Sequence, residues 1–371
     1  MKPGAPGDDA AGTAEEKAGS RWYTSPVTLD GLDLSALDGY LRSADIGRDG
    51  ELTAQLISGG RSNLTFLVAD DSSKWVLRRP PLHGLTPSAH DMAREYKVVA
   101  ALEDTAVPVA RAVTLCNDES VLGAPFQMVE YVAGQVVRTR AELEALGDQQ
   151  VIDGCVDGLI QVLADLHAVD PATVGLADFG KPDGYLQRQV RRWGSQWELV
   201  RRQDDDRDAD VTRLHTALQE STPQQSRTSI VHGDYRIDNT ILDATDPARV
   251  RAVVDWELST LGDPLSDAAL MCVYRDPSLD LIINAHAAWT SPQLPVADEL
   301  AQKYSVVSGQ PLAHWNFYMA LAYFKLAIIA AGIDFRRRMS AGQNDAEAAS
   351  DRVGETVAPL IARGLTELHG A

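Results

Sequence analysis

The sequence has few cysteines, few aromatic residues and too little positive charge for a protein that binds nucleic acid. Among 371 residues it carries 34 Lys and Arg against 53 Asp and Glu, a formal net charge of −19. Binding to nucleic acid, or to the anionic surface of a membrane, depends on clustered basic residues that meet phosphates. The charge balance therefore argues against both kinds of partner.

The three cysteines, Cys116, Cys155 and Cys272, stand far apart and form no CxxC pair. This spacing argues against a zinc site or a disulfide framework and fits free thiols in a reducing cytoplasm. Aromatic residues make up only 6% of the chain. The core must therefore be built mainly from Leu, Val, Ala and Ile. Because the thiols are expected to be free and reduced, we expect a cytoplasmic protein.

A continuous apolar run of the kind a signal peptide needs is missing from the N-terminal segment, which is rich in Pro, Gly, Ala and acid. We interpret residues 1–22 as a disordered tail. The longest apolar stretch, Trp315–Ile333, approaches the span of a bilayer, but it contains Asn316 and Lys325. We predict a buried helix there, in which Lys325 needs a carboxylate, a phosphate or a wet cleft to face.

Two regions with different patterns follow the tail. Residues 23–132 predict a small antiparallel sheet with one helix, and the C-terminal region, residues 133–371, is mainly helical. The expected fold is α+β, with a small N-lobe and a larger C-lobe. Strands are expected within Leu52–Leu67 and at Lys74–Arg79, Ala110–Leu115 and Phe126–Val132, and helices at Ser88–Leu102, Gly154–His167, Gly184–Val200, Val296–Val307, Trp315–Ile333 and Asn344–Glu367.

Polar side chains gather at one end of a predicted hairpin. Asn239 precedes the strand Thr240–Leu242, and Asp255 follows the strand Val250–Val254. Because the two ends of a hairpin lie side by side, Asn239 and Asp255 should lie close together. Asp234 stands in the loop that leads into the hairpin. Three oxygen-bearing side chains at one place suit Mg²⁺, which prefers oxygen ligands.

The order of these residues resembles a known catalytic segment. The motif HGDxxxxN at residues 232–239, then a hairpin, then Asp255, then GDPxxD at residues 262–267, is similar to the aminoglycoside phosphotransferase and choline kinase branch of the protein-kinase-like fold. The spelling HGD, in place of the HRD of protein kinases, marks that branch. The resemblance spans roughly residues 50–335 and implies a two-lobe, protein-kinase-like fold.

The resemblance implies a role for each residue of the motif. Asp234 would accept or orient the proton of an acceptor hydroxyl, and Asn239 and Asp255 would hold Mg²⁺. His232 would orient the loop through its ring. Asp267 would bond backbone groups of the catalytic loop.

The resemblance extends to the nucleotide site in the N-lobe. Arg78 falls where kinases place a lysine on the third strand to contact the α- and β-phosphates, and Glu95 falls at its ion-pair partner. Arginine keeps the charge and offers a planar fork for two phosphate oxygens, and the adjacent Arg79 is the rival for this contact. The glycine turn departs from GxGxxG and could be a simple hairpin turn. The other expected nucleotide contacts are Gly59, Gly60, Ser62, Asn63 and the hinge Val129, Glu130 and Tyr131.

These features imply transfer of the γ-phosphate of ATP, with Mg²⁺, to a hydroxyl of a small molecule. No long activation segment fits between Asp255 and residues 262–267, which argues against a protein substrate. The alternative is a nucleotide-binding pseudokinase, which Arg78 favours and the intact motif opposes. The candidates to line an acceptor pocket, each of which could equally be a packing or surface residue, are Arg236, Trp256, Glu257, Trp193, Trp197 and Lys325.

Two longer strings narrow the resemblance. VLRRPPLHGLTPSAHDMAREYKVVAAL and HGDYRIDNTILD are most similar to the kinase-like domain fused to acyl-CoA dehydrogenases in some eukaryotes and to its free-standing actinobacterial homologues. This resemblance implies a hydroxyacyl compound, or its CoA thioester, as the acceptor, and makes an aminoglycoside a less favoured one. No dinucleotide-binding GxGxxG follows a strand, so we expect no flavin chemistry.

Overall fold

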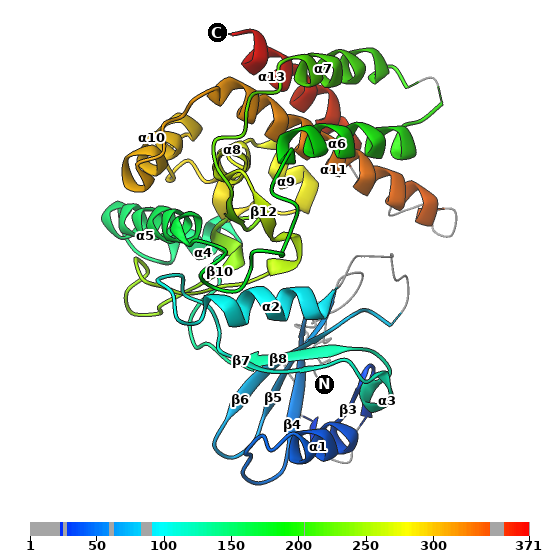
Figure 1. Cartoon of the computed structure of the whole chain (residues 1–371), viewed down its shortest axis with the longest axis vertical. Coiled ribbons are helices and arrows are strands. Elements are labelled where there is room, and N and C mark those ends of the chain that lie inside the picture. The colour runs from blue at the N-terminus through cyan, green and yellow to red at the C-terminus, as the bar shows by residue number, and fades with distance from the viewer. Residues whose placement is uncertain are drawn as a thin grey trace, which may run out of the picture. The chain divides into compact units, whose positions relative to one another are not determined.

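The computed structural model describes residues 23–24, 28–58, 63–82, 91–203, 205–341 and 352–370. It has the predicted α+β architecture, with an antiparallel sheet in the N-terminal region and mainly helices after it (Figure 1). Contacts within the chain define two compact units. The smaller unit is Met1–His90 with Leu115–Met128, and the larger is Asp91–Thr114 with Val129–Ala371.

A six-stranded sheet dominates the N-terminal region, in the order β1-β4-β5-β6-β8-β7. Apolar side chains alternate along its central strands, so that Phe66 pairs with Leu77 and both are buried. Helix α1 buries Leu37 and Leu41 on one face, and the side chain of Asp33 caps its first turn. The elements are β1 (Tyr23–Thr24), β2 (Thr28–Leu29), β3 (Leu32–Asp33), α1 (Leu34–Ser43), β4 (Thr53–Ser58), β5 (Leu64–Ala69), β6 (Lys74–Arg79), α2 (Met92–Leu102), β7 (Ala112–Cys116), α3 (Glu119–Leu122) and β8 (Phe126–Glu130).

Helix α2 belongs by its contacts to the larger unit, whereas the sequence placed it in the N-lobe. The guanidinium of Arg94 donates to the backbone carbonyl of Ser259 at 3.0 Å and lies 4.0 Å from the ring centre of Phe179. Lys97 pairs with Asp178 at 2.6 Å. The buried Val98, Val99 and Leu102 of α2 also belong to the apolar core of the larger unit.

The predicted starts of two helices lie outside the described residues. Helix α2 begins at Met92, where the side chain of Asp91 accepts the backbone N–H of Arg94, and the predicted start at Ser88 lies outside the described residues. The last predicted helix, Asn344–Glu367, is described only from its second half. There a short 3₁₀ turn leads into α13, which begins at Val357.

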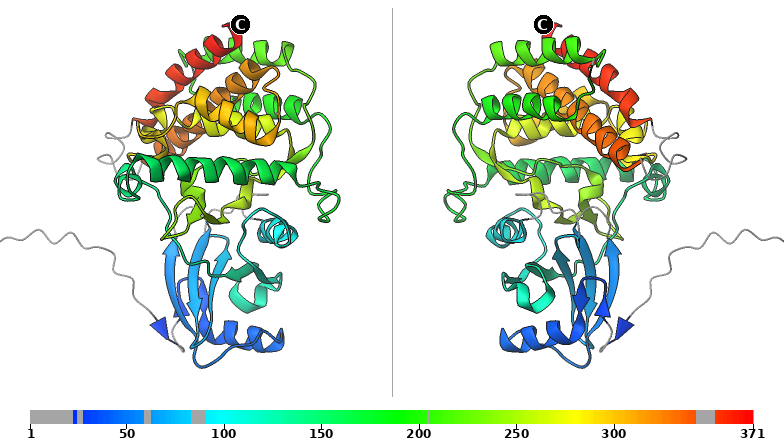
Figure 2. Two further views of the ribbon diagram at one scale, coloured as in Figure 1. Left: turned by 90° about the vertical axis from the view of Figure 1, so that its left-hand side faces the viewer. Right: turned by 90° about the vertical axis from the view of Figure 1, so that its right-hand side faces the viewer.

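Helices make up most of the larger unit, and α11 packs against α6, α8 and α13 (Figure 2). The core of the larger unit also contains the buried faces of α5 and α8. The helical elements are α4 (Arg140–Glu144), α5 (Gln149–Ala168), α6 (Tyr185–Val200), α7 (Asp208–Glu220), α8 (Pro264–Val273), α9 (Ser278–Ile283), η3 (Ala288–Thr290), α10 (Ala297–Ser308), α11 (Trp315–Ala341), η4 (Val353–Thr356) and α13 (Val357–His369).

The long apolar stretch forms part of α11. Among the described residues, one helix, Trp315–Met339, is long and apolar enough to cross a membrane, and 78% of its apolar window is buried within the protein. Phe324 and Ile328 on it are fully buried. The extent of this burial agrees with the predicted core helix.

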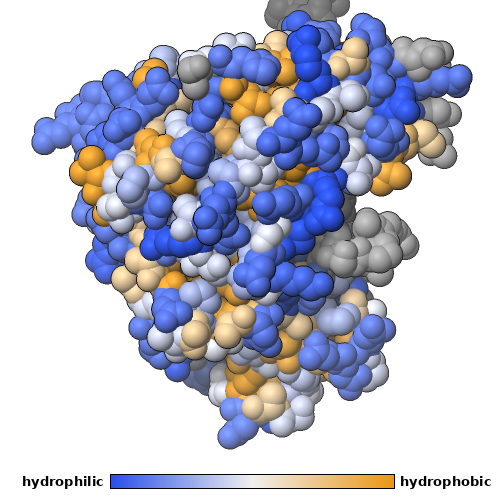
Figure 3. Space-filling view, turned by 45° about the horizontal axis from the view of Figure 1, so that its top comes forward, coloured by the Kyte–Doolittle hydropathy of each residue, from blue (hydrophilic) through white to orange (hydrophobic). Residues whose placement is uncertain are grey.

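Polar side chains cover most of the face seen in Figure 3, with small apolar groups scattered among them. Such scattered apolar groups are ordinary for a protein surface.

The three cysteines lie inside the protein. Cys116, Cys155 and Cys272 are all free and buried. Burial raises the pKa of Cys155 to about 12, which keeps this thiol in its unreactive, protonated form.

The predicted hairpin is present in the larger unit and brings its two ends together. Strand β10 pairs antiparallel with β11, with Thr240 opposite Val253, and the backbone N–H of Val254 donates to the carbonyl of Asn239 at 2.9 Å. The flanking strands β9 and β12 pair with each other in turn. The elements are β9 (Ser229–Val231), η1 (Ile237–Asn239), β10 (Thr240–Leu242), β11 (Val250–Val253), η2 (Trp256–Leu258) and β12 (Thr260–Gly262).

Candidate active site

The backbone of the loop after β9 is held from two sides. The carboxylate of Asp267, in the first turn of α8, accepts the N–H of His232 at 2.6 Å and of Gly233 at 2.8 Å. The ammonium of Lys325, on α11, donates to the carbonyl of Gly233 at 2.9 Å. Gly233 has φ +87°, and a Cβ there would lie 2.9 Å from Leu258, so glycine is required by both conformation and space.

The ring of His232 is fully used in orienting this loop. Its Nδ1 accepts the backbone N–H of Asp234 at 3.2 Å, and its Nε2 donates to the carbonyl of Val254 at 2.9 Å. One neutral tautomer, with the proton on Nε2, satisfies both bonds. The ring is therefore placed as the predicted loop-orienting role requires.

A buried histidine behind the loop completes the environment of Asp267. The Nε2 of His167 lies 3.4 Å from the Asp267 carboxylate, and its Nδ1 lies 2.8 Å from the hydroxyl of Tyr304. Burial opposes the charge of Asp267, but the hydrogen bond and charge of His167, with the N–H of Gly233, outweigh it and lower the pKa of this carboxyl. No role was predicted for His167, which lies in the last turn of α5, a helix predicted from apolar spacing alone.

Asp234 is surrounded by three hydrogen-bond donors. The hydroxyl of Tyr274 donates to Oδ1 at 2.5 Å. The side-chain amide of Asn239 donates to Oδ2 at 3.0 Å and to the Asp234 backbone carbonyl at 2.7 Å. A guanidinium nitrogen of Arg236 lies 3.4 Å from Oδ2. Asp234 and Asn239 thus meet as the motif predicted, while Tyr274 was not foreseen.

Arg236 is an internal ion-pair partner in this arrangement. Its guanidinium lies between Asp234 and Asp238, 3.3 Å from the latter, and 5.3 Å from the ring centre of Tyr274. Burial alone would lower the pKa of Arg236, but the two carboxylates outweigh it and raise the pKa. Because Arg236 is committed to its neighbours, its predicted place in an acceptor pocket gains no support.

Three carboxylates meet beyond the hairpin. Ligand atoms of Glu95, Asp255 and Glu257 lie within 4.8 Å of one another, with Glu95 buried and Glu257 exposed. Glu95, predicted to pair with Arg78, and Glu257, predicted to line the acceptor pocket, both lie beside Asp255. The pairing of Glu95 with Arg78 stays a prediction. A set of carboxylate oxygens, with the amide oxygen of Asn239 at the adjoining start of the hairpin, fits a hard divalent cation such as Mg²⁺.

The two neighbouring arginines of β6 have different surroundings. Arg79 is buried, and its guanidinium donates to the carbonyls of Gly31 at 2.7 Å and Leu122 at 2.6 Å. Burial lowers the pKa of Arg79. Since adjacent residues of a strand point to opposite faces, Arg78 points away from these carbonyls. Arg79 is therefore a structural residue, and Arg78 stays the candidate for phosphate contact.

The remaining predicted nucleotide contacts are only partly described. Gly59, Gly60 and Ser62 lie outside the described residues, and Asn63 is buried. At the predicted hinge, Val129 and Glu130 end β8, and Tyr131 is exposed. The N–H of Glu130 already donates to the carbonyl of Arg111 at 2.8 Å, so that group is committed to the sheet and not to adenine.

A small cavity lies next to Gly233, between α6, α8 and α11. It has a volume of about 20 Å³, enough for a single water-sized group, and its lining includes Trp193, Ser266 and Lys325. The indole nitrogen of Trp193 and the hydroxyl of Ser266 are buried without a hydrogen-bond partner among the residues that the structure describes. The ammonium of Lys325 lies 5.8 Å from the ring centre of Trp193. Burial lowers the pKa of Lys325, although Asp234 and Asp267 oppose this.

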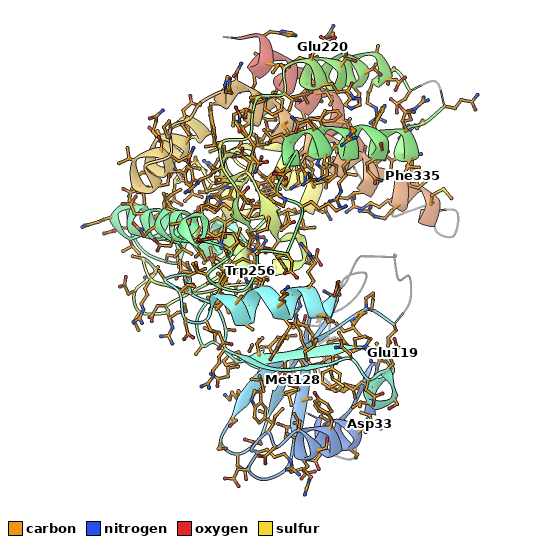
Figure 4. The ribbon with its side chains drawn as sticks, in the orientation of Figure 1. Asp33, Glu119, Met128, Glu220, Trp256 and Phe335 are labelled. Carbon is orange, nitrogen blue, oxygen red and sulfur yellow. The ribbon has the colours of Figure 1, made fainter. Side chains whose placement is uncertain are left out.

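Two tryptophans predicted to line the acceptor pocket are packing residues instead. Trp256, marked in Figure 4, is buried against His232 and donates its indole N–H to the carbonyl of Val253 at 3.0 Å. Trp197 is buried and donates to Asp208 at 2.7 Å. Of the six predicted acceptor residues, Trp193 and Lys325 are the two that line the cavity beside the catalytic loop.

The fold and the order of these residues are those of a known family of enzymes. The chain belongs to the phosphotransferase enzyme family called APH, whose model matches residues 53–300. The predicted family and the protein-kinase-like fold are thereby confirmed. A solved structure of a Ralstonia eutropha protein, provisionally named an aminoglycoside phosphotransferase, is 33% identical, with a TM-score of 0.76 over 91% of this chain and 99% of that one.

A more distant neighbour shares the fold alone. The aminoglycoside phosphotransferase APH(4)-Ia, solved as a thermostable mutant in a ternary complex with AMP-PNP and hygromycin B, is 14% identical, with a TM-score of 0.58. It covers 91% of this chain and 100% of its own. The nucleotide and the antibiotic in that complex are properties of that protein.

Curated relatives confirm the predicted link to acyl-CoA dehydrogenases. Mouse acyl-CoA dehydrogenase family member 11 is 34% identical over 90% of this chain and 43% of its own length. Mouse family member 10 is 35% identical over 81% of this chain and 28% of its own length. This chain therefore spans less than half the length of these relatives.

Proposed function

We propose that this protein transfers the γ-phosphate of ATP, with Mg²⁺, to a hydroxyl group of a small molecule. The observation that carries this proposal is the convergence at the hairpin. Asp234 bonds Asn239 on one side, and Asp255 meets two further carboxylates on the other. Family membership and the phosphotransferase fold support the same reaction class.

Each residue has a defined part in the proposed reaction. Asp234 orients the acceptor hydroxyl and takes its proton, and Arg78 holds phosphate oxygens. Asn239 and Asp255 hold Mg²⁺, with Glu95 and Glu257 beside Asp255. The chemistry that Mg²⁺ supplies when bound is neutralisation of phosphate charge. The protein contributes position and electrostatics, which are the main sources of rate in phosphoryl transfer.

The acceptor we propose is a hydroxyacyl compound or its CoA thioester. The cavity beside Gly233 has room for one oxygen atom of the acceptor, and its ammonium, indole N–H and hydroxyl suit a carbonyl or carboxylate oxygen. The Lys325 ammonium there would repel a polycationic aminoglycoside. The relatives named after acyl-CoA dehydrogenases favour the same class of acceptor. The proposed compartment is the cytoplasm, where ATP and thiols in the reduced form are available.

The proposed function is tested by an ATP-consumption screen with Mg²⁺ over hydroxyacyl-CoAs, amino alcohols and aminoglycosides. Turnover with hydroxyacyl-CoAs is expected, with product phosphorylation checked by mass spectrometry. The matched inactive control is Asp234→Ala. A purified protein that binds Mg·ATP but phosphorylates no hydroxyl compound would instead favour the pseudokinase.

Asp255→Asn is expected to weaken the binding of ATP in the presence of Mg²⁺ by about tenfold or more, because it removes one charge from the cation site. ATP binding measured without Mg²⁺ should change much less. Calorimetric titrations with and without the cation make this comparison. Asp243→Asn, in the distant turn of the same hairpin, is the control. Equal losses in both titrations would show that Asp255 does not serve the cation.

Lys325→Met is expected to raise the KM of a hydroxyacyl-CoA by about tenfold, because it removes the proposed hydrogen bond from the Lys325 ammonium to the acceptor. A charge-assisted bond of this kind contributes roughly 1.5–3 kcal/mol. The KM of Mg·ATP should stay nearly constant. Steady-state kinetics with each substrate varied in turn separate the two. Lys303→Met removes an exposed lysine paired with Asp157 and should leave both constants unchanged. An unchanged acceptor KM in Lys325→Met would remove Lys325 from the acceptor site.

A further inference from the structure

Tyr274 makes a direct contact with the proposed catalytic carboxylate although it lies 40 residues away in the chain. It follows the last residue of α8, is 5% exposed, and its hydroxyl donates to Oδ1 of Asp234 at 2.5 Å. Bonds between a hydroxyl and a carboxylate are among the shortest and strongest in proteins. The contact is therefore a strong restraint on the side chain of Asp234.

Helix α8 holds the catalytic loop at both of its ends. Asp267 in its first turn accepts the N–H groups of His232 and Gly233. Tyr274, at the other end of the helix, bonds the side chain of Asp234. The backbone N–H of Tyr274 donates to Leu270, which keeps this residue in register with the helix. The loop backbone and the reacting side chain are thus positioned by a single rigid element.

The three donors around Asp234 are divided unequally between its two oxygens. Asn239 and Arg236 both approach Oδ2. Among the described residues, Tyr274 alone is hydrogen-bonded to Oδ1. A carboxylate has about four lone-pair directions, so the three donors leave room for one acceptor hydroxyl. Without the Tyr274 hydroxyl, Oδ1 would have no hydrogen-bond donor among the described residues. The carboxylate would then be freer to turn about its Cβ–Cγ bond.

We propose that Tyr274 is a positioning residue for phosphoryl transfer, whose hydroxyl fixes the rotation of the Asp234 carboxylate and so aims its free lone pair at the nucleophile. The inference rests on the proposed function of Asp234. Burial, with the charge of Asp234 adding to it, raises the pKa of Tyr274 well above its ordinary value. The phenol therefore keeps its proton and does not itself serve as the base. Arg236, 5.3 Å from the ring centre, keeps the phenol in place.

The test uses Mg·ATP with water as the nucleophile, so that it does not depend on the identity of the acceptor. Tyr274→Phe is expected to lower kcat for ATP hydrolysis about tenfold and to leave the KM of Mg·ATP within about twofold, because orientation matters only in the transition state. The matched control is Tyr323→Phe, which removes the hydroxyl of another buried tyrosine, one that interacts with Arg363. The kcat of Tyr323→Phe should equal that of the wild type.

A second measurement follows the hydrogen bond itself and needs no turnover. In thermal unfolding, the Tm losses of Tyr274→Phe and Asp234→Ala should not add in the double variant, because both remove the same bond. Additive losses would overturn the proposal. An unchanged or increased kcat in Tyr274→Phe would also overturn it, as would a loss explained by a smaller fraction of protein that binds ATP. If Asp234→Ala leaves turnover intact, the proposed function itself fails and this inference with it.

Discussion

Asp234→Ala is expected to lower the rate of phosphoryl transfer about 10²–10⁴-fold, the range in which positioned general bases contribute. The binding of Mg·ATP should change little, because the proposed cation ligands, Asn239 and Asp255, remain. Rapid-quench measurement of single-turnover rates, with calorimetry for ATP affinity, separates these two quantities. The separation matters because a loss of binding and a loss of chemistry would look alike in a simple activity assay.

The change also removes a hydrogen-bond acceptor of three side chains, Asn239, Arg236 and Tyr274, so the folded state must be checked. Arg236 keeps Asp238 as its ion-pair partner in this variant. Tyr274 loses the acceptor of its hydroxyl. Asp246→Ala is the control, since this residue lies in the exposed far turn of the hairpin, where it accepts the N–H of Ala248. Activity in Asp234→Ala above about a tenth of the wild-type rate would exclude Asp234 as the catalytic base.

The parts of the site that sequence could predict are those fixed by local geometry. Asn239 and Asp255 flank a short hairpin, and the pairing of Thr240 with Val253 brings the two ends together in any protein with this turn. The bond between Asp234 and Asn239 spans five residues of the same loop. Such short-range features depend little on how the rest of the chain packs.

The parts that sequence missed come from helix packing over long separations. Tyr274 reaches Asp234 across 40 residues, and His167 reaches Asp267 across 100. Neither residue belongs to a motif, and a tyrosine or histidine on an apolar helix is ordinarily a packing residue. A buried polar group needs a partner, so these two residues could have been flagged as needing one but not matched to it.

A different kind of ambiguity affected the strand that carries Arg78 and Arg79. Alternation shows that the two side chains face opposite ways, but the segment Lys74–Arg79 does not tell which face is the core. The carbonyls of Gly31 and Leu122, which bind Arg79, come from segments remote in sequence. The assignment therefore required the packed structure.

Asp267→Ala is expected to lower the free energy of unfolding by about 3–5 kcal/mol, the cost of breaking a buried, charged hydrogen-bond network by removing one partner. Two N–H groups of the catalytic loop and the ring of His167 would lose their acceptor. Activity should fall with stability, because Gly233 and Asp234 would no longer be held. Urea unfolding measures the first effect. Asp157→Ala, which breaks an exposed ion pair with Lys303, should cost little.

The pH dependence of stability distinguishes the loss of the Asp267 charge from a general packing defect. Because the folded protein lowers the pKa of Asp267, its charged form stabilises the fold above the pKa of the unfolded chain, about 3.9. That contribution is lost as the pH falls through the lower, folded value. The stability difference between wild type and Asp267→Ala should therefore be constant at neutral pH and shrink in acid. A difference that stays the same below about pH 3 would show that the charge of Asp267 does not hold the loop.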